Sequence, residues 1–567
     1  MELFEKHKDT FVRAQTACHE RHCWSPFPEL PAKYPRAVEM QAAGLAAYHS
    51  HLAKRFALEQ PGPVLDEVGE EVSPYTQQTL GIRYPQSDVD QLFAAAQVAM
   101  PDWSEASIDM RIGVLMEVVD TIFREHLFEI AHAVMHTAGQ SYNMAYAGSG
   151  VNALDRAIEA LVYAHQSMHA VAPKARWERQ FGASSIVLDK TYRLIPRGVA
   201  VCFTCASFPT WNAWPSMMAS LATGNAVIVK PHPATVLPMA ISVNVFRRVL
   251  AAAGFDANLV TMALDTTDEP IGKILVKHPK TAIVDFTGSV RFGQWVEQNA
   301  HPALCFTETA GCNTVVLDSV LDLDAVLRSL ATTLCMFSAQ MCTSPQNIYV
   351  PAHGVKTPQG IVPLREVASR LADAVAAVSA DPKKAAMILA AIQSDQTIAL
   401  ISQIEQTIES IKSPEAEIIL KPQVYVHPEF PNARTSTPLM AMVGKAQREL
   451  YCQERFGPIS FVIACEDTAD ALHQATADVR QFGGLTAFLY STDEDYIAKA
   501  EHAYACAGAQ LTINLTGAMP LNFAAAYSDY HVTGLNPAGN AALTSLAFVS
   551  GRFCIAQSRR PSSPTST

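Results

Sequence analysis

Long apolar runs and an export signal are both missing from this sequence. Its apolar runs, such as residues 198–206, are far shorter than the roughly 18 residues that a membrane-spanning helix needs. The first ten residues, MELFEKHKDT, carry mixed charges and contain no apolar signal-peptide core. We therefore expect a cytoplasmic protein that inserts into no membrane.

Charge is also scarce, and basic clusters are absent. Only 17% of the 567 residues are charged, and 54 acidic side chains against 42 basic ones give a net charge of −12. Proteins that bind nucleic acid contact its phosphates through clustered Lys and Arg, which this chain lacks. We expect no nucleic-acid partner and a small-molecule substrate. Because 49% of the residues are hydrophobic, the chain is apolar enough to form several compact units.

A disulfide framework is a third feature that the sequence does not predict. Its 12 cysteines are scattered along a chain without an export signal, which indicates reduced thiols. Cys18, His19, His22 and Cys23 could offer four zinc ligands, but they lie too close together and no second ligand pair follows. We therefore expect no metal site.

Helical sequence precedes residue 184, and alternating sequence follows it. Residues 89–134 have the apolar spacing of amphipathic helices. The stretch SSIVLDKTYRLIP (184–196) alternates and contains a short polar turn, so we expect a β-hairpin there. After it, short β-rich runs take turns with amphipathic helices, which is typical of parallel sheets with crossover helices.

This alternation forms two series, and two α/β units in tandem are the simplest interpretation. The first series comprises expected strands at 199–203, 226–229, 259–263 and 282–286 and helices at 213–222, 240–253 and 271–276. The second comprises expected strands at 314–317, 347–350 and near 418 and 425, with helices at 323–336 and onward through 411. We expect a loop at 412–417 and a disordered tail at 556–567.

The two common glycine-rich phosphate loops, G-x-G-x-x-G and G-x-x-x-x-G-K-[ST], are absent. The nearest approach, residues 148–150 (GSG), follows helical sequence and lacks the preceding strand. Residues 286–289 (FTGS) instead join a strand end to a helix start, where Gly288 permits a tight turn and Ser289 can cap the helix. The N–H groups of that first turn suit a pyrophosphate, although a capped helix without a ligand has the same pattern.

A carboxylate and a thiol are the candidates for catalysis. Glu308 ends the apolar stretch LCFTE, and burial raises a carboxyl pKa toward the range of a general base that works near neutral pH. Cys342, in SAQMCTSP, follows a predicted helix among small residues, where a substrate can reach a thiolate nucleophile. Taken singly, Glu308 could be a surface residue and Cys342 a buried small hydrophobe.

Five segments in order resemble the NAD(P)-dependent aldehyde dehydrogenases, and the resemblance runs from about residue 93 to 555. Residues 221–231 resemble that family's L-x-x-G-N-x-x-x-x-K-P segment, and residues 286–289 resemble its F-T-G-S. Glu308 stands where the family has its general base, and residues 340–342 resemble its G-Q-x-C nucleophile motif, with Ala339 replacing Gly. Residues 454–458 resemble its E-x-F-G-P. The N-terminal stretches LFEKHKDTFVRAQ and CWSPFPELP most resemble the PaaN-type enzymes of phenylacetate degradation.

The resemblance implies cofactor-binding roles that the local chemistry permits. Lys230 would bind the adenosine ribose, and Gly288 and Ser289 with the adjoining helix N-terminus would hold the pyrophosphate. Glu454 would bind the nicotinamide ribose, and Phe456 would pack beside the nicotinamide. Without a cofactor, Lys230 would form a surface ion pair and Ser289 would only cap a helix. Glu454 would then be a surface carboxylate and Phe456 a core aromatic.

One departure from the family concerns the oxyanion. Ser207 stands where the family has an Asn that donates to the oxyanion, and Asn212 lies five residues too late to replace it. A hydroxyl can still donate one hydrogen bond, so the resemblance implies a catalytic role for Ser207 with the backbone N–H of Cys342. At 308–312 the sequence ETAGC replaces the usual E-L-G-G-K.

A second departure concerns the cofactor. NAD-preferring members carry a Glu shortly after the Lys that accepts from the adenosine 2′-hydroxyl, and KPHP (230–233) has none. Without that carboxylate, Lys230 and His232 could pair with a 2′-phosphate. We therefore expect NADP in preference to NAD.

The resemblance also implies an α/β fold with two Rossmann-like domains and a β-hairpin oligomerisation arm, in a homodimer or homotetramer. The expected parts are an N-terminal helical and irregular extension at 1–95, a nucleotide-binding domain at 96–305 interrupted by the arm at about 180–197, a catalytic domain at 306–520, and a C-terminal segment at 521–555 that returns to the cofactor and oligomer region, followed by the tail.

The expected reaction is NAD(P)-dependent oxidation of an aldehyde to a carboxylic acid through a thiohemiacetal and a thioester on Cys342. The subfamily resemblance suggests an aldehyde or semialdehyde from aromatic-ring degradation, with or without CoA attached. Three alternatives stay open. A CoA-acylating dehydrogenase would not need Glu308, a non-catalytic member of the fold would need neither Glu308 nor Cys342, and a simple cysteine hydrolase would not need Lys230, Ser289 and Glu454.

Overall fold

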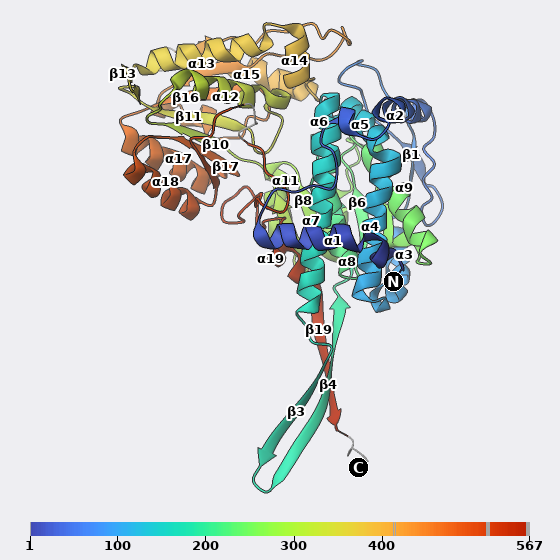
Figure 1. Ribbon diagram of the computed structural model, residues 1–567. Coiled ribbons are helices and arrows are strands. Elements are labelled where there is room, and N and C mark those ends of the chain that lie inside the picture. The colour runs from blue at the N-terminus through green and yellow to red at the C-terminus, as the bar shows by residue number, and fades with distance from the viewer. Residues whose placement is uncertain (1, 412, 414–415, 518–521, 563–567) are drawn as a thin grey trace.

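The computed structural model describes residues 2–411, 413, 416–517 and 522–562. Two lobes lie side by side, and a long β arm projects away from one of them (Figure 1). Each lobe is built around its own mostly parallel sheet. The expected fold of two Rossmann-like α/β units with a β-hairpin arm is therefore confirmed.

The first lobe contains a parallel five-stranded sheet in the order β7-β6-β5-β8-β9. Its strands are β5 Val199–Phe203, β6 Ala226–Lys230, β7 Val260–Met262, β8 Thr281–Thr287 and β9 Leu304–Glu308, and its helices are α8 Ala213–Ala222, α9 Leu237–Ala252, α10 Gly272–Lys277 and α11 Val290–Asn299. All four expected strands and all three expected helices of this series are present. The register pairs Thr287 with Glu308, so the FTGS turn and the candidate base meet at one edge of the sheet.

The second lobe contains a seven-stranded sheet in the order β14-β15-β16-β11-β10-β17-β18, with only β14 antiparallel. Its strands are β10 Asn313–Leu317, β11 Pro345–Pro351, β14 Ala416–Leu420, β15 Leu439–Val443, β16 Ile459–Cys465, β17 Thr486–Tyr490 and β18 Gln510–Ile513, with β12 Val355–Thr357 and β13 Gly360–Val362 as a separate hairpin. Its helices are α12 Leu323–Cys335, α13 Leu364–Ser379, α14 Pro382–Ile388, α15 Asp395–Ser410, α16 Arg448–Tyr451, α17 Thr468–Phe482 and α18 Glu494–Ala507.

The N-terminal segment packs onto the first lobe. It comprises α1 Glu2–Glu20, α2 Ala37–His51, β1 Asp66–Val68, β2 Tyr84–Gln86, α3 Val89–Glu105, α4 Ile108–Thr121, α5 Leu127–Ala138, α6 Tyr142–Tyr146 and α7 Ala153–His169. Helix α1 contacts α4 and α7, and its Phe11 belongs to the same hydrophobic core as Val201 of β5. The region expected as an extension is thus part of the wall of the first lobe.

The arm differs from its prediction in two ways. Its turn lies at Gly182–Ala183, between β3 Lys174–Phe181 and β4 Ser184–Pro196, so the stretch 184–196 is one strand and not a complete hairpin. The expected disorder from residue 556 is wrong as far as Pro561, because β19 Phe553–Pro561 pairs with β4 along its whole length. Backbone hydrogen bonds to β4 order this polar segment, and such bonds cannot be predicted from side-chain composition. Residues 563–567 lie outside the described part.

Two smaller expectations also need correction. No strand forms at Tyr425, whose hydroxyl instead donates a hydrogen bond to Ala390 O across 2.5 Å. The loop expected at 412–417 falls largely outside the described residues, and β14 already begins at Ala416. Among the described residues, no helix is both long and apolar enough to cross a membrane.

A buried ion pair joins the base of the arm to the first sheet. The Arg552 guanidinium contacts the Asp285 carboxylate of β8 at 2.5 and 2.8 Å, and it also donates to Ser220 Oγ and Phe548 O. Arg552 is fully buried. Desolvation raises the pKa of Asp285, while Arg552 opposes that shift.

We predict that Arg552→Met lowers stability by about 3 to 5 kcal/mol, because it leaves the Asp285 carboxylate buried without its cation. Urea unfolding of the full chain, followed by circular dichroism, measures this as a lower transition midpoint. The matched control is Arg365→Met, which breaks the exposed pair with Glu417 and should cost less than about 1 kcal/mol. Equal midpoints for the two variants would contradict the assignment.

Candidate active site

The predicted site residues gather at one cleft between the two lobes, with a volume of about 1620 Å³. The predicted residues that line it are Ser207, Lys230, His232, Gly288, Ser289, Cys342, Glu454 and Phe456. Glu308 lies directly behind Cys342 and has no exposed surface. The sequence motifs of the two α/β units therefore converge in space.

Cys342 lies in a constrained loop between α12 and β11. Phe337, Ser338 and Ala339, in the short 3-10 segment Met336–Ala339, all have φ near +50°, a left-handed conformation that side chains with a Cβ rarely adopt. The buried Gln340 amide donates to Phe337 O and Ala391 O and accepts from Gln393 N. Gln340, the first residue of the segment 340–342, thus holds the loop against the chain that follows α14.

Asn313, the first residue of β10, fixes the loop from its other side. Its Nδ2 donates to Cys342 O at 2.7 Å and to Ser344 O at 2.9 Å, while its Oδ1 accepts from Leu485 N and Thr486 N. Asn313 is 1% exposed, so these bonds form away from solvent. The backbone of the nucleophile is therefore oriented before any substrate binds.

The Glu308 carboxylate faces the Cys342 thiol from the end of β9. Cys342 Sγ lies 3.6 Å from Glu308 Oε1, a distance at which the thiol can donate a hydrogen bond to the carboxylate. The other carboxylate oxygen, Oε2, is buried and has no hydrogen-bond partner among the described residues. This free acceptor can receive a proton from a water molecule that enters the cleft.

His531 completes the group and was not predicted from the sequence. Its Nε2 lies 3.0 Å from Glu308 Oε1 and 3.7 Å from Cys342 Sγ. It comes from the segment that follows β18, in which Asn540 exchanges hydrogen bonds with the backbone of Thr307. No sequence motif surrounds His531, so the sequence did not indicate a role for it. Its place in the site becomes visible only because the chain returns to β9 in the folded structure.

The surroundings of Cys342 oppose its ionisation. Desolvation, followed by the charges of Glu308, Cys205 and Glu454, raises the pKa of the Cys342 thiol well above its usual value. A thiol must ionise before it can act as a nucleophile at neutral pH. Of the two described side chains that hydrogen bond to Cys342 Sγ, only His531 can carry a positive charge.

The FTGS turn has the geometry that a pyrophosphate would need. Ser289 is the N-cap of α11, and its Oγ accepts from Phe292 N. Gly288 N donates to Glu308 O, and a Cβ on Gly288 would lie 2.8 Å from the Phe286 ring. Gly288, Ser289 and Phe292 line the cleft, so the N-terminus of α11 faces it, as an anion-binding helix would.

Lys230 has an acidic partner that the sequence did not indicate. Its Nζ lies 2.7 Å from Oδ1 of Asp265, a buried residue that follows β7 and lines the same cleft. Desolvation lowers the pKa of Lys230, whereas Asp265 raises it. A carboxylate thus does lie beside Lys230 in the folded chain. The absence of a Glu in KPHP is therefore no longer a reason to expect NADP.

His232 is unsuited to pair with a phosphate. Its Nδ1 accepts a hydrogen bond from Ala234 N at 3.1 Å. Desolvation and the neighbouring Lys230 ammonium lower the pKa of His232 to about 4. The Lys230 ammonium beside it thus opposes a second positive charge at His232.

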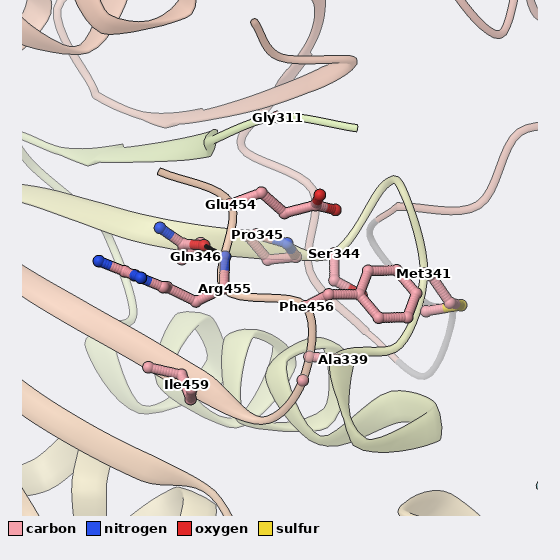
Figure 2. A pocket seen from close by; sticks show the side chains of 11 residues that line it. Gly311, Ala339, Met341, Ser344, Pro345, Gln346, Glu454, Arg455, Phe456 and Ile459 are labelled. Carbon is pink, nitrogen blue, oxygen red and sulfur yellow. Dashed lines mark hydrogen bonds between the residues drawn. The ribbon is translucent and has the colours of Figure 1, made fainter. Parts of the chain in front are cut away.

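Glu454 and Phe456 extend toward the same side of their loop, whereas Arg455 and Gln346 point the other way (Figure 2). The Gln346 amide of β11 fixes the loop by accepting from Arg455 N and donating to Tyr451 O and Gln453 O. Desolvation raises the pKa of Glu454 to about 7. Near neutral pH this carboxyl can both accept from and donate to ribose hydroxyls.

Comparison with known proteins agrees with this geometry. The sequence pattern of the Aldehyde dehydrogenase family matches residues 65–524. The chain belongs to the aldehyde dehydrogenase family. The crystal structure of an NAD-dependent aldehyde dehydrogenase from Burkholderia multivorans superposes with a TM-score of 0.95 at 43% identity, over 100% of both chains. A 1-pyrroline-5-carboxylate dehydrogenase from Thermus with bound NAD has the same fold, with a TM-score of 0.74 at 17% identity over 95% of this chain and 99% of that one.

Curated relatives match over shorter stretches. Aldehyde dehydrogenase LUC3 of Fusarium sp. is 27% identical over 286 residues, which cover 50% of this chain and 56% of that protein. The 1-pyrroline-5-carboxylate dehydrogenase 2 of Bacillus subtilis (strain 168) is 27% identical over 272 residues, or 46% of this chain and 49% of that protein. The chain spans about half the length of the curated relatives it matches.

The loop after β5 brings Ser207 and Asn212 to the cleft. Ser207 lines the cleft, and its carbonyl accepts from the Gln140 amide. Asn212 also lines the cleft, but its Nδ2 donates to Thr287 Oγ1 at 3.2 Å. The role of Ser207 toward the oxyanion stays a prediction, and the amide of Asn212 lies at the nucleotide side of the cleft.

Much of the cleft lining is apolar. Leu30 and Pro31 of the N-terminal segment line the cleft together with Met144, Phe208 and Trp211. Helix α1 and the loop after it therefore bring a part of the chain outside the two α/β units to the cleft. Leu30 and Pro31 end the stretch CWSPFPELP, whose subfamily resemblance did not indicate that it reaches the cleft.

The potential zinc ligands near residue 20 do not form a common site. Cys18 is buried within α1, whereas Cys23 is exposed beyond its end. Among the described residues, no group of three or more potential metal ligands includes Cys18, His19, His22 or Cys23. Gly148–Gly150 lies in a π-helical turn between α6 and α7, which is no phosphate loop.

We predict that Gln346→Met weakens NAD(H) binding about tenfold, because it keeps the side-chain volume but frees the loop that presents Glu454 and Phe456. Titration of NADH fluorescence measures the Kd. Gln359→Met, at an exposed position in the β12–β13 turn, is the control and should leave the Kd unchanged. An unaltered Kd in Gln346→Met would show that the loop does not depend on this amide.

Proposed function

We propose that this protein oxidises an aldehyde to a carboxylic acid with NAD as the hydride acceptor. The observation that carries the proposal is the 3.6 Å contact of Cys342 Sγ with Glu308 Oε1, in the cleft that also contains Lys230 and Ser289. A nucleophile, a base and an anion-binding helix N-terminus on one cleft are what this reaction requires.

The chain's residues have distinct tasks in this reaction. The Cys342 thiolate attacks the aldehyde carbon, and the Cys342 backbone N–H with Ser207 Oγ would donate to the oxyanion. NAD held by Lys230, Ser289 and Glu454 would supply the hydride acceptor, and loss of hydride from the thiohemiacetal carbon would convert the Cys342 adduct to a thioester. Glu308 Oε2, which is buried and unpartnered among the described residues, then removes a proton from the water that hydrolyses the thioester.

The choice of NAD over NADP rests on Asp265. Its carboxylate beside Lys230 would accept from an adenosine 2′-hydroxyl and would repel a 2′-phosphate. It would take the part of the Glu that the sequence KPHP lacks. The similar structure from Burkholderia multivorans is that of an NAD-dependent enzyme, which supports the same choice.

The substrate proposal rests on the apolar part of the cleft lining. Leu30, Met144, Phe208 and Trp211 would favour a substrate with an apolar or aromatic body over a short polar one. This agrees with the PaaN-type resemblance and an aldehyde or semialdehyde from aromatic-ring degradation, either free or attached to CoA. The cytoplasmic location stays a prediction.

The arm supports the proposal of a homodimer or homotetramer. It projects from the first lobe (Figure 1) and exposes apolar side chains along its strands, namely Phe181, Ile186, Ile195 and Ile555. A three-stranded sheet without its own core gains stability when such side chains are buried against a second subunit.

We predict that Cys342→Ala abolishes aldehyde oxidation, with a loss of about a thousandfold or more, because no other described thiol contacts Glu308. Glu308→Gln should form the thioester and stall, so that a burst of NADH precedes a steady rate about 100-fold below that of the wild type. Mass spectrometry of the trapped acyl-enzyme and stopped-flow absorbance measure both results.

The same assay with a panel of aliphatic, aromatic and CoA-linked aldehydes, run with and without free CoA, identifies the substrate and product. Formation of an acyl-CoA in place of an acid would replace the proposal with a CoA-acylating dehydrogenase. Product formation without any nucleotide would indicate a hydrolase, and no turnover with the whole panel would favour a non-catalytic member.

We predict that Asp265→Asn raises the ratio of kcat/KM for NADP to that for NAD about tenfold or more, because it removes the charge that repels a 2′-phosphate while it keeps the acceptor for Ile271 N. Asp268→Asn, three residues away and exposed, controls for a general change of charge. A wild-type enzyme that already prefers NADP would contradict the proposal.

A further inference from the structure

The contacts of His531 place it in the catalytic group. Its Nε2 is the only imidazole nitrogen that the described structure brings to Cys342 Sγ, at 3.7 Å, and it lies 3.0 Å from Glu308 Oε1. The ring is 5% exposed and packs against Trp211 at 5.9 Å between ring centroids. Its backbone N donates to Thr544 Oγ1, which fixes the position of the residue.

Among the described residues, the other titratable groups that act most strongly on Cys342 oppose a thiolate. Glu308 at the end of β9, Cys205 after β5 and Glu454 before β16 are neutral or negative, and each raises the pKa of the thiol. Glu308 alone would therefore be a poor partner for a negative sulfur. A cation at the position of His531 would offset both the burial and the carboxylate.

We propose that His531 is the base that ionises Cys342 and keeps it as a thiolate–imidazolium pair. The S–H bond of Cys342 breaks and a bond forms between that proton and His531 Nε2, so the imidazole becomes a cation and the sulfur an anion. The new Nε2–H then donates to Glu308 Oε1, whose negative charge stabilises the imidazolium. The inference rests on the proposed function, because it deepens the role of the same site.

In this arrangement His531 accepts the thiol proton and Glu308 accepts the water proton. If His531 holds the thiol proton, Glu308 stays ionised and its unpartnered Oε2 is free to take the proton of water in the later hydrolysis. When the thioester is hydrolysed, Cys342 departs as the thiolate beside the same imidazolium, and the water proton passes from Glu308 to solvent. The two steps thus use different oxygen and nitrogen atoms.

The test measures the alkylation of Cys342 by iodoacetamide in the enzyme without aldehyde, at several pH values, with the Cys342 peptide quantified by mass spectrometry. Even a thiol with an ordinary pKa of about 8.5 is only a few per cent ionised at pH 7, and the surroundings of Cys342 raise its pKa further, so His531→Gln should react at least about 30-fold more slowly there than the wild type. Its rate should rise with pH, whereas the wild-type rate stays nearly level from pH 6 to 8.

Glu308→Gln separates the two roles. It should still alkylate Cys342 rapidly at pH 7 but should stall at the acyl-enzyme, whereas His531→Gln should deacylate normally once acylated. His531→Phe keeps the ring packing on Trp211 and should behave as His531→Gln does. Added imidazole should restore part of the alkylation rate in His531→Ala, a result that a merely structural role would not produce.

The chain supplies a matched control in a second pair of the same kind. On α18, Cys506 Sγ lies 3.8 Å from His502 Nε2, and Cys506 is exposed. His502→Gln should leave the alkylation of Cys342 unchanged. Thermal unfolding of each variant verifies that it is folded before its rates are compared.

An alkylation profile in His531→Gln equal to that of the wild type would overturn the inference, as would a loss of rapid alkylation in Glu308→Gln with His531 intact. The outcome does not depend on aldehyde turnover. A protein that oxidised no aldehyde but showed His531-dependent alkylation would contradict the proposed function and leave the inference in place.

Discussion

The approach of Cys342 to Glu308 is the constraint on which the rest of the site depends. The two residues come from different α/β units, so the lobes must be held at one separation for their side chains to meet. Asn313 secures the Cys342 backbone, and the register of β8 with β9 sets Glu308 beside Thr287. Small shifts between lobes would separate the thiol from its base, and rates depend steeply on such distances.

The chain after β18 stabilises this geometry. It runs from the second lobe back to the first, where Asn540 bonds to the Thr307 backbone and Arg552 pairs with Asp285 inside the first sheet. His531 lies within the same segment. One stretch of chain therefore links the lobes, carries an imidazole to the thiol and continues into the arm as β19, which couples the site to the surface proposed for assembly.

Much of the fold could be predicted because its strands and helices have local signals. The strand at 199–203 and the helix at 213–222 follow from their apolar patterns alone and agree with β5 and α8. The arm could not be placed in this way. Strand β19 is exposed and polar, and it exists because its backbone pairs with β4, so a composition that resembles disorder gave the wrong result.

The sequence by itself determined the family, and it located the residues proposed as nucleophile and base and the turn proposed to bind the nucleotide, because each lies in a short motif whose residues are neighbours in the chain. Only the tertiary structure decided that Asp265 lies beside Lys230 and that His531 lies beside Cys342. In both cases the partners come from segments that are distant in the chain. Their electrostatic interaction depends on distance in space, which no spacing in the sequence records.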